Sequence, residues 1–566
     1  MSRKQQQDQS HVILWLSAAL LIPLYYGLIS VHNGLQGPDR IHHDARLHII
    51  WLQRFVDPQL FPGDYIADYF QDFAPRGFKA LYWSAAQLGI EPLILAKYLP
   101  LPIAILTSIY CFELCLQIFP IPAGAFISVL ILNQGLWLRD DVISATPRAF
   151  ATLLFAAFLC YLLKRQLIPC LGIILLQGLF YPMLVLLEVG ILMVRLCHIK
   201  GWLPKLSRDP IDYWFAGGGM AIAFLVLLPN LLNPPDYGPV MTAAQMQQMP
   251  EFYPQGRTPY FGVHPILFWT SGRSGIRIPI MPPILCLAFL FPMVSRTKSS
   301  LAAFITSKKA VLWHILLSAL ILYTLAHFVL LKLYFPSRYT YYAFRFILTI
   351  AASITITILV DIGLQWLIKK MKSTAVLTAK QMSVAIGLMF LCGSMVIVPA
   401  LPLVFLGTHY WHVGKYPDLY HFIRQQPQDI MIATLSKEAD NLPSLTQRSV
   451  LASRNTAISF HSGYYKTIQN RIIDLISAQY DLDLDRVQQF IKTYGIDFWL
   501  LDRQAFTPDY IAKNGWLMQF QPRAGEAIAR LQAGGTPALV KQIESCTVLK
   551  NDSLILLRAD CILAQD

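Results

Sequence analysis

Charged residues are scarce in this sequence: Asp, Glu, Lys and Arg make up 14% of its 566 residues, against 55% hydrophobic residues. Soluble domains are about one quarter charged, so a soluble fold is excluded for most of the chain. The shortage is uneven, because apolar runs dominate residues 1–410 whereas residues 411–566 have an ordinary soluble composition. We therefore predict a polytopic α-helical membrane domain over 1–410 and a soluble α/β domain over 411–566.

Several common functional motifs are also missing. No CxxC pair occurs among the nine cysteines, which argues against a zinc site. There is no GxGxxG, P-loop or GxSxG motif, no internal repeat and no low-complexity tract. The net charge is +13, but the sequence has no basic stripe with interleaved aromatic residues, so we expect no nucleic-acid partner.

Apolar runs that could cross a membrane fill the first part of the chain. A span needs about 20 apolar residues. The candidates are 11–31, 92–117, 121–138, 145–163, 168–181, 183–199, 210–232, 278–295, 310–334, 341–368 and 383–409. The first is interpreted as a retained helix rather than a signal peptide, because it has no small-residue cleavage site.

The fifth and sixth candidates are short and meet at Tyr181-Pro182, where proline interrupts the helix, so one long bent helix is the alternative. Lys and Arg accumulate in cytoplasmic loops. With Arg3 and Lys4 inside, the basic loops all fall on one side only if 168–199 crosses twice. This predicts about eleven transmembrane helices, with a cytoplasmic N-terminus and an extracytoplasmic C-terminal domain, in a membrane that is most simply a prokaryotic plasma membrane.

Two predicted outer loops are long. Loop 32–91 is too long for a connector and contains two predicted surface helices, 44–56 and 77–88. The first is predicted to lie at the membrane interface, because its apolar residues share one face. These residues are Leu47, Ile50, Trp51 and Phe55. Loop 233–277 is rich in proline, glycine and aromatic residues, which suits a lid or a docking surface.

The C-terminal residues 411–566 alternate between strand-like and helix-like patterns. Apolar runs at 429–435, 497–501 and 553–558 predict strands, and three-to-four spacing of apolar residues predicts helices over 464–480 and 484–493. Cys546 and Cys561 are the only cysteines in this part. We expect them to form a disulfide, because the segment is predicted to face an oxidising compartment.

Three polar clusters fall at the predicted outer membrane face: His42-His43-Asp44-Ala45-Arg46, Arg139-Asp140-Asp141 and Pro336-Ser337-Arg338-Tyr339. Each also has a purely structural interpretation. Asp44 could be the N-cap of the surface helix, and Asp140 or Asp141 could cap the fourth span. Arg338 could extend its charge to the membrane interface.

The order of these clusters resembles the GT-C superfamily of membrane glycosyltransferases. The segment HHDARLHIIWLQRFVDPQLFPGDY is similar to the catalytic acidic motif that follows the first helix in family 39, the protein mannosyltransferases and bacterial aminoarabinose transferases. Asp44 stands at the catalytic position, and Ala45 replaces the usual Glu. LRDDVISATPRAF is similar to a second acidic site, and LYFPSRY to the segment that contacts the lipid phosphate. No WWDYG signature is present, which disfavours an oligosaccharyltransferase catalytic subunit.

The resemblance implies an enzyme of the cell envelope that moves a hexosyl or pentosyl group from a polyprenyl-phosphate donor to a hydroxyl of a glycan, lipid or protein. A single base and direct displacement imply inversion at the anomeric carbon. Asp44 would be the general base, and Asp140 or Asp141 would orient the acceptor or Asp44. Arg338 is the first choice for binding the donor phosphate. The reserves are Arg46, Arg139 and Arg345.

We predict no cofactor. A divalent metal remains an open alternative because loop 32–91 contains four scattered carboxylates, but such residues are usually only solvated. They are Asp57, Asp64, Asp68 and Asp72.

Two other functions compete with glycosyl transfer. A transporter or lipid flippase would place ionisable groups within the spans, and Glu188 is the main such residue. Pairing of Glu188 with Tyr181 or Gln177 is the favoured structural interpretation. A non-catalytic assembly protein would use the C-terminal domain for binding. Convergence of Asp44, an aspartate of the second cluster and Arg338 in space would favour the enzyme.

Overall fold

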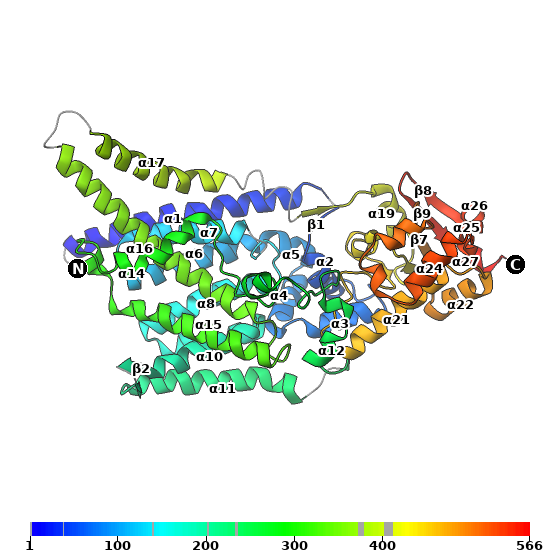
Figure 1. Cartoon of the computed structure of the whole chain (residues 1–566), viewed down its shortest axis with the longest axis horizontal. Helices are drawn as coiled ribbons and strands as arrows, with labels where there is room; N and C mark the ends of the chain where they lie inside the picture. The colour runs from blue at the N-terminus through cyan, green and yellow to red at the C-terminus, as the bar shows by residue number, and fades with distance from the viewer. Residues whose placement is uncertain are drawn as a thin grey trace.

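The computed structural model describes residues 3–37, 39–138, 141–200, 203–232, 236–371, 378–400 and 411–565. The molecule is elongated, with a helical bundle at one end and a mixed helix–sheet region at the other (Figure 1). The N-terminus lies at the far end of the bundle and the C-terminus at the opposite end of the molecule.

Each of the predicted spans contains helix. The elements are α1 (Arg3–Leu35), α5 (Pro92–Tyr98) with α6 (Pro100–Ile118), α7 (Pro122–Trp137), α8 (Pro147–Lys164), α9 (Leu167–Phe180), α10 (Met183–Leu196), α11 (Pro210–Leu232), η3 (Pro283–Leu290) with α14 (Phe291–Val294), α15 (Ala310–Phe328), α16 (Ser337–Met371) and α17 (Ala379–Ala400). Within the described residues, six helical stretches are long and apolar enough to cross a membrane. The chain is therefore a helical membrane protein, and the number of crossings stays a prediction.

Proline begins several of these helices, and its fixed φ angle suits the first turn, where no backbone donor is needed. Nearly every side chain of α8 is buried, as expected for a helix that is apolar on all faces and lies inside a bundle. Large apolar side chains on α1, α11 and α15, including Leu28, Phe224 and Trp313, are exposed and would face lipid.

Helices α9 and α10 form an antiparallel hairpin beside α11. A methyl group added to Gly178 of α9 would lie 2.6 Å from Val226, and one added to Gly219 of α11 would lie 2.7 Å from Leu192 of α10 and 3.6 Å from Ile174 of α9. Leu192 of α10 and Ile174 of α9 thus lie beside the same residue of α11. Because these two residues are on either side of Pro182 in the chain, the chain reverses its direction there. The single bent helix is excluded, in agreement with the charge distribution of the loops.

The predicted interfacial helix over 44–56 is wrong. Strand β1 (Arg40–His42) is followed by α2 (Ala45–His48) and a 3₁₀ helix, η1 (Ile50–Phe55). Leu47, Ile50 and Trp51 are buried in a core shared with residues of the C-terminal part, which takes the place of the membrane. The predicted helix over 77–88 is confirmed as α4 (Arg76–Gln87), and α3 (Tyr65–Phe73), which was not predicted, precedes it.

The remaining loops contain short elements. On the side opposite loop 32–91, β2 (Cys197–Lys200) pairs with β3 (Leu203–Leu206), and the short 3₁₀ helices η4 (Ala302–Phe304) and η5 (Ser307–Lys309) precede α15. The loop after α11 contains α12 (Ala243–Gln247), η2 (Pro250–Phe252) and α13 (Pro265–Thr270).

A five-stranded mixed sheet forms the centre of the C-terminal part. Its order is β6-β5-β7-β9-β8, with β5 parallel to β6 and β7, and β9 antiparallel to β7 and β8. The strands are β5 (Met431–Ala433), β6 (Ser449–Val450), β7 (Phe498–Asp502), β8 (Thr547–Lys550) and β9 (Leu554–Arg558). The helices are α19 (Pro417–Arg424), η6 (Lys437–Asp440), α20 (Leu442–Thr446), α21 (Ser462–Gln479), α22 (Leu484–Tyr494), α23 (Pro508–Ala512), η7 (Leu517–Gln519), α24 (Arg523–Gln532), α25 (Ala538–Lys541), α26 (Ile543–Cys546) and α27 (Ala559–Leu563). The three predicted strands and two predicted helices are present as β5, β7, β9, α21 and α22.

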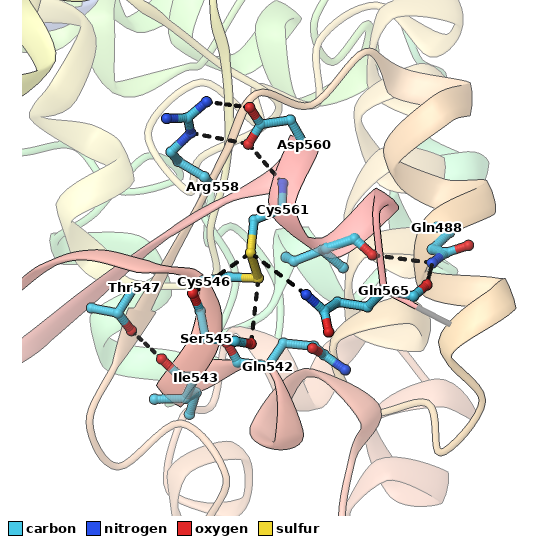
Figure 2. The surroundings of a disulfide bond; sticks show 11 residues. Gln488, Gln542, Ile543, Ser545, Cys546, Thr547, Arg558, Asp560, Cys561 and Gln565 are labelled. Atoms are coloured by element: carbon cyan, nitrogen blue, oxygen red, sulfur yellow. Dashed lines mark hydrogen bonds and ion pairs between the residues drawn. A yellow bond between two sulfur atoms is a disulfide. The ribbon is translucent and has the colours of Figure 1, made fainter.

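The predicted disulfide between Cys546 and Cys561 is confirmed. It connects α26 to α27, with the two Cα atoms 5.5 Å apart (Figure 2). Beside it, the Gln488 amide donates hydrogen bonds to the carbonyl oxygens of Ile562 and Gln565, which attach α27 to α22.

The C-terminal part contacts loop 32–91 and the end of α1. Strand β4 (Trp411–Val413) pairs antiparallel with β1, placing His412 opposite Ile41. Gly34 of α1 leaves room for the Trp411 ring, since an added methyl group would lie 2.6 Å from it. Both parts therefore lie on the same side of the bundle. The predicted boundary at residue 410 falls within 401–410, outside the described residues.

Candidate functional site

Asp44 lies directly after β1, at the end of the bundle that contacts the C-terminal part. It occupies the N-cap position of α2, but its side chain makes no capping hydrogen bond. Its carboxylate instead lies 2.6 Å from the guanidinium of Arg148, the second residue of α8, and stays 26% exposed. The capping interpretation of Asp44 is therefore wrong, and the carboxylate is accessible to a bound molecule.

Electrostatics keep Asp44 ionised. Burial raises the pKa of this carboxyl, but the positive charge of Arg148, followed by the histidines His48, His42 and His43, lowers it to about 2. His42 also accepts a hydrogen bond at Nδ1 from the backbone N–H of Asp44, 3.2 Å away. Asp44 is thus an anion at neutral pH, able to accept a proton or a hydrogen bond.

Asp141, from the loop between α7 and α8, lies deeper in the same region. It forms a buried ion pair with Arg345 of α16 and accepts a hydrogen bond from the Tyr341 hydroxyl at 2.5 Å. Arg345 also donates to Thr152, 3.1 Å away. Burial raises the pKa of Asp141, but Arg345, Arg148 and Tyr341 lower it to about 2. Thr146, rather than Asp141, is the N-cap of α8.

Arg148 connects the two carboxylates, because its Nε also lies 4.0 Å from Asp141. The first two predicted clusters therefore meet in space around a residue that sequence reasoning did not select. Its position in the sequence was a usable signal: Arg148 is in the quoted LRDDVISATPRAF segment, at the outer end of a predicted span. The other two residues of the second cluster, Arg139 and Asp140, lie outside the described residues.

Arg338, at the start of α16, joins this group. Its guanidinium lies 5.9 Å from the centre of the Tyr334 ring and within electrostatic reach of Arg148 and Tyr181. Among the described residues, no carboxylate lies within ion-pair distance of Arg338. A cation at this position is therefore not neutralised by a described residue, as binding of an anionic ligand would require.

The loop between α11 and α15 contributes further arginines that were not predicted. Arg273 lies over the Phe335 ring at 5.0 Å, and Arg277 lies over the Tyr341 ring at 4.9 Å. Burial, together with the nearby charges of Arg338, Arg257 and Arg277, lowers the pKa of Arg273 to about 10. Such mutual repulsion indicates a local excess of positive charge.

Arg257 adds a further positive charge close to Arg273. Burial lowers the pKa of Arg257, although Asp440 and Asp44 oppose this effect. Its Nε is buried and has no hydrogen-bond partner among the described residues. A phosphate-bearing ligand would supply both the missing acceptor and the missing negative charge.

Two of the reserve arginines already have protein partners. Arg46 is buried and donates a hydrogen bond to Asn441 of the C-terminal part, with Glu438 and Asp440 nearby. Arg345 is occupied by Asp141. Of the arginines predicted to bind phosphate, only Arg338 has an open arrangement within the described residues.

The four carboxylates considered as metal ligands in loop 32–91 each have a separate partner. Asp57 accepts from Gln428, and Asp64 caps α3 by accepting from Ile66 and Ala67. Asp68 pairs with Arg54, and Asp72 accepts from Tyr237. Each of these side chains therefore has a structural role of its own.

Glu188 does not have the partners expected for it. It is fully buried in α10, and neither carboxyl oxygen has a hydrogen-bond partner among the described residues. Gln177 donates instead to the Tyr181 carbonyl, 3.0 Å away. The pairing interpretation of Glu188 is therefore wrong.

No family model and no curated protein sequence matches the chain. The Archaeoglobus fulgidus oligosaccharyltransferase AglB, solved with an inhibitory peptide and a dolichol-phosphate, matches with a TM-score of 0.55 at 10% identity, over 91% of this chain and 72% of AglB. The Archaeoglobus fulgidus oligosaccharyltransferase tethered with an acceptor peptide gives a TM-score of 0.54 at 11% identity, over 91% of this chain and 72% of that chain.

The apo structure of ArnT from Cupriavidus metallidurans matches with a TM-score of 0.50 at 12% identity and covers 99% of each chain. At these identities the likeness concerns the fold. The chain shares its fold with AglB and ArnT, so the resemblance found in the sequence is confirmed at the level of the fold.

Proposed function

We propose that this protein is an inverting glycosyltransferase that moves a sugar from a polyprenyl-phosphate donor to an acceptor hydroxyl at the outer membrane face. One observation carries the proposal: the ionised and accessible Asp44 carboxylate lies in a region rich in arginine at one end of the membrane bundle. These arginines are Arg148, Arg257, Arg273, Arg277 and Arg338. A general base and a phosphate-binding region are the two parts that the reaction needs.

The reaction is a direct displacement at the anomeric carbon. The acceptor oxygen forms a bond to that carbon while the bond to the phosphate oxygen breaks, and the acceptor proton passes to Asp44. Attack from the face opposite the leaving phosphate inverts the configuration. Arg148 holds the Asp44 carboxylate in place, because the two groups form an ion pair.

The leaving phosphate gains negative charge during this step, and fixed cations stabilise it. Arg338 is suited to this role because no described carboxylate neutralises it, and its planar guanidinium can donate two parallel hydrogen bonds to phosphate oxygens. Arg273 and Arg277 lie over neighbouring rings and add positive charge from the loop before α15. Asp141 orients the site indirectly, through Arg148 and Arg345.

A lipid-linked donor agrees with the position of the site and with the dolichol-phosphate bound to the similarly folded AglB. The acceptor supplies a hydroxyl group, which a glycan, a lipid or a protein can each present. Membrane lipids surround the spans, and the proposed reaction uses no metal or cofactor.

The proposed topology has eleven crossings, a cytoplasmic N-terminus and an extracytoplasmic C-terminal part, in a prokaryotic plasma membrane. Two observations support this orientation. Arg165 and Arg195, expected on the cytoplasmic side, meet at one end of the bundle through Asp209 and Asp212. The C-terminal part carries a disulfide and pairs with loop 32–91 at the other end.

The test is transfer of a radiolabelled sugar from polyprenyl-phosphate donors by the purified full-length protein, comparing wild type with Asp44→Asn. Loss of a general base lowers the rate about 10²–10⁴-fold. The variant should remain folded, because the amide keeps the shape of the side chain. Asp68→Asn is the matched control, since Asp68 pairs with Arg54 in the same loop. Undiminished transfer by Asp44→Asn, or no transfer by wild type from any donor, contradicts the proposal.

A further inference from the structure

We propose that the protein has a second ligand site, separate from Asp44, which binds the anionic phosphate-bearing headgroup of a membrane lipid. The site is a cavity of about 310 Å³ between α5 and the C-terminal part. Its polar lining residues include Arg40, Gln53, Glu91, Lys97, Arg424 and Ser444. The volume is sufficient for a lipid headgroup, and the proposal is independent of the transfer reaction.

Two buried polar atoms in the cavity lining lack partners. Gln53 is 4% exposed and Ser444 is 7% exposed. Neither the Oε1 of Gln53 nor the Oγ of Ser444 has a hydrogen-bond partner among the described residues. Buried polar side-chain atoms are nearly always hydrogen-bonded, so these two atoms indicate a polar ligand. The Ser444 hydroxyl can donate to a phosphate oxygen, and Gln53 Oε1 can accept from a headgroup hydroxyl.

The charged lining residues favour an anion. Three cations, Arg40, Lys97 and Arg424, line the cavity together with one carboxylate, Glu91. Arg424 already pairs with Asp39. Arg40 donates from Nη1 to the Asn33 carbonyl and the Gln36 side chain, which are both uncharged. Lys97 has no hydrogen bond or ion pair to any described residue, so its ammonium group can bind the ligand.

The position of the cavity favours a lipid over a soluble anion. Leu93 and Ile94 of α5 line it together with Trp411, and Ile94 is itself 38% exposed. Tyr98, one turn further along α5, is also exposed on the surface of a membrane span. A lipid can therefore place its phosphate near Lys97 while its chains lie along this outer surface of the bundle.

The cavity is adjacent to the transfer site but does not include its carboxylate. His42 and Ala45 line the cavity, whereas Asp44, between them, turns to Arg148 and is absent from the lining. Changes at Lys97 should therefore alter lipid binding without removing the carboxylate–arginine cluster.

Native mass spectrometry of the full-length protein in detergent tests the proposal, with dioctanoyl phosphatidic acid, dioctanoyl phosphatidylcholine and inorganic phosphate as separate probes. We expect saturable binding of one phosphatidic acid, at least tenfold tighter than either other probe. Lys97→Gln should weaken it about tenfold or more, because a hydrogen bond to a charged group is lost. Lys97→Arg should retain binding, and Lys79→Gln, on α4 and outside the cavity lining, should leave it unchanged.

Ser444→Ala gives a second variant, since it removes the unpaired hydroxyl without adding bulk, and it should also weaken binding. Equal binding of phosphatidylcholine, or equal weakening by Lys79→Gln, would overturn the proposal by showing nonspecific lipid association. Inorganic phosphate that binds as tightly as phosphatidic acid would overturn the lipid assignment in favour of a free-anion site.

Discussion

The guanidinium of Arg148 lies 2.6 Å from the carboxylate of Asp44, although the two residues are 104 positions apart in the chain. The same guanidinium lies 4.0 Å from Asp141. One cation thus connects the acidic segment after the first helix with the acidic segment before α8. In the proposed mechanism this contact fixes the position of the base and keeps it deprotonated.

Arg148→Gln should shift the acid limb of the pH–rate profile. Without this cation, burial acts on Asp44 with less opposition, and the pKa of the carboxyl rises from about 2 toward or above its ordinary value. Wild-type activity should stay constant down to about pH 4. The variant should begin to lose activity at a pH about 2 units higher than wild type does. Arg148→Lys should restore most of the wild-type profile.

Arg54→Gln is the control for this experiment, because Arg54 pairs with Asp68 in the same loop and not with Asp44. An Arg148→Gln profile that keeps the wild-type shape at reduced rate would show that Arg148 does not set the pKa of Asp44.

Arg338→Gln should weaken both donor binding and turnover. If Arg338 contacts the leaving phosphate, its loss should raise KM for the polyprenyl-phosphate donor and lower kcat, with about a 10²-fold fall in kcat/KM. Arg338→Lys should recover only part of the loss, because one ammonium cannot reproduce two parallel hydrogen bonds. Steady-state kinetics over a range of donor concentrations measure both parameters. Arg76→Gln, on the exposed surface of α4, should behave like wild type.

Asp141→Asn should mainly destabilise the fold. The change leaves the buried guanidinium of Arg345 without its carboxylate, and breaking a buried ion pair in this way costs about 3–5 kcal/mol. Thermal unfolding in detergent should show a clear fall in Tm. The double variant Asp141→Asn/Arg345→Met should regain part of it, since no unpaired charge remains. Asp209→Asn, which removes an exposed ion pair with Arg165, should have a much smaller effect.

The sequence was most informative where one physical force dominates. Hydrophobic runs located the helices of the bundle, and the charge of the loops indicated the α9–α10 hairpin, because membrane insertion responds to just these two properties. Apolar patterning also located β5, β7 and β9. The same patterning wrongly placed Leu47, Ile50 and Trp51 at the membrane interface. Packing against a distant part of the chain and packing against lipid both require apolar side chains, so the pattern cannot distinguish the two.

The grouping of charged residues in the candidate site was predicted in part for a related reason. Asp44, Asp141 and Arg338 were selected because they belong to three polar clusters at the predicted outer face, and the order of these clusters resembles the GT-C superfamily. Arg257, Arg273 and Arg277 lie in a long loop where arginine is unremarkable. Only the folded chain brings Arg277 over the Tyr341 ring of α16 and Arg273 close to Arg257 and Arg338. The hydrogen bond from Arg46 to Asn441, which is 395 positions away in the chain, likewise depends on tertiary contact.

Acid should loosen the contact between the C-terminal part and loop 32–91. Burial lowers the pKa of His461 to about 4, and its Nδ1 lies 2.9 Å from the Tyr69 hydroxyl. A histidine with a lowered pKa binds fewer protons when folded than when unfolded, so stability falls as pH drops from about 6.5 to 4. Up to about 3 kcal/mol should be lost over this window. Tm measured between pH 4 and 7 should show a smaller slope for His461→Gln than for wild type, whereas His421→Gln, at an exposed position of α19, should keep the wild-type slope.

The disulfide allows the orientation of the C-terminal part to be checked without any assay of activity. Cys546 and Cys561 are bonded, and the other seven cysteines are free. Protein that is denatured without reductant should therefore present seven reactive thiols, rising to the nine of the sequence after reduction. The bond forms in the cell only if this part reaches an oxidising compartment, so nine reactive thiols before reduction would contradict the extracytoplasmic placement. Replacing both cysteines by serine should cost about 3 kcal/mol, as expected for closing a loop of 15 residues, and should lower Tm without changing the ion pair between Asp44 and Arg148.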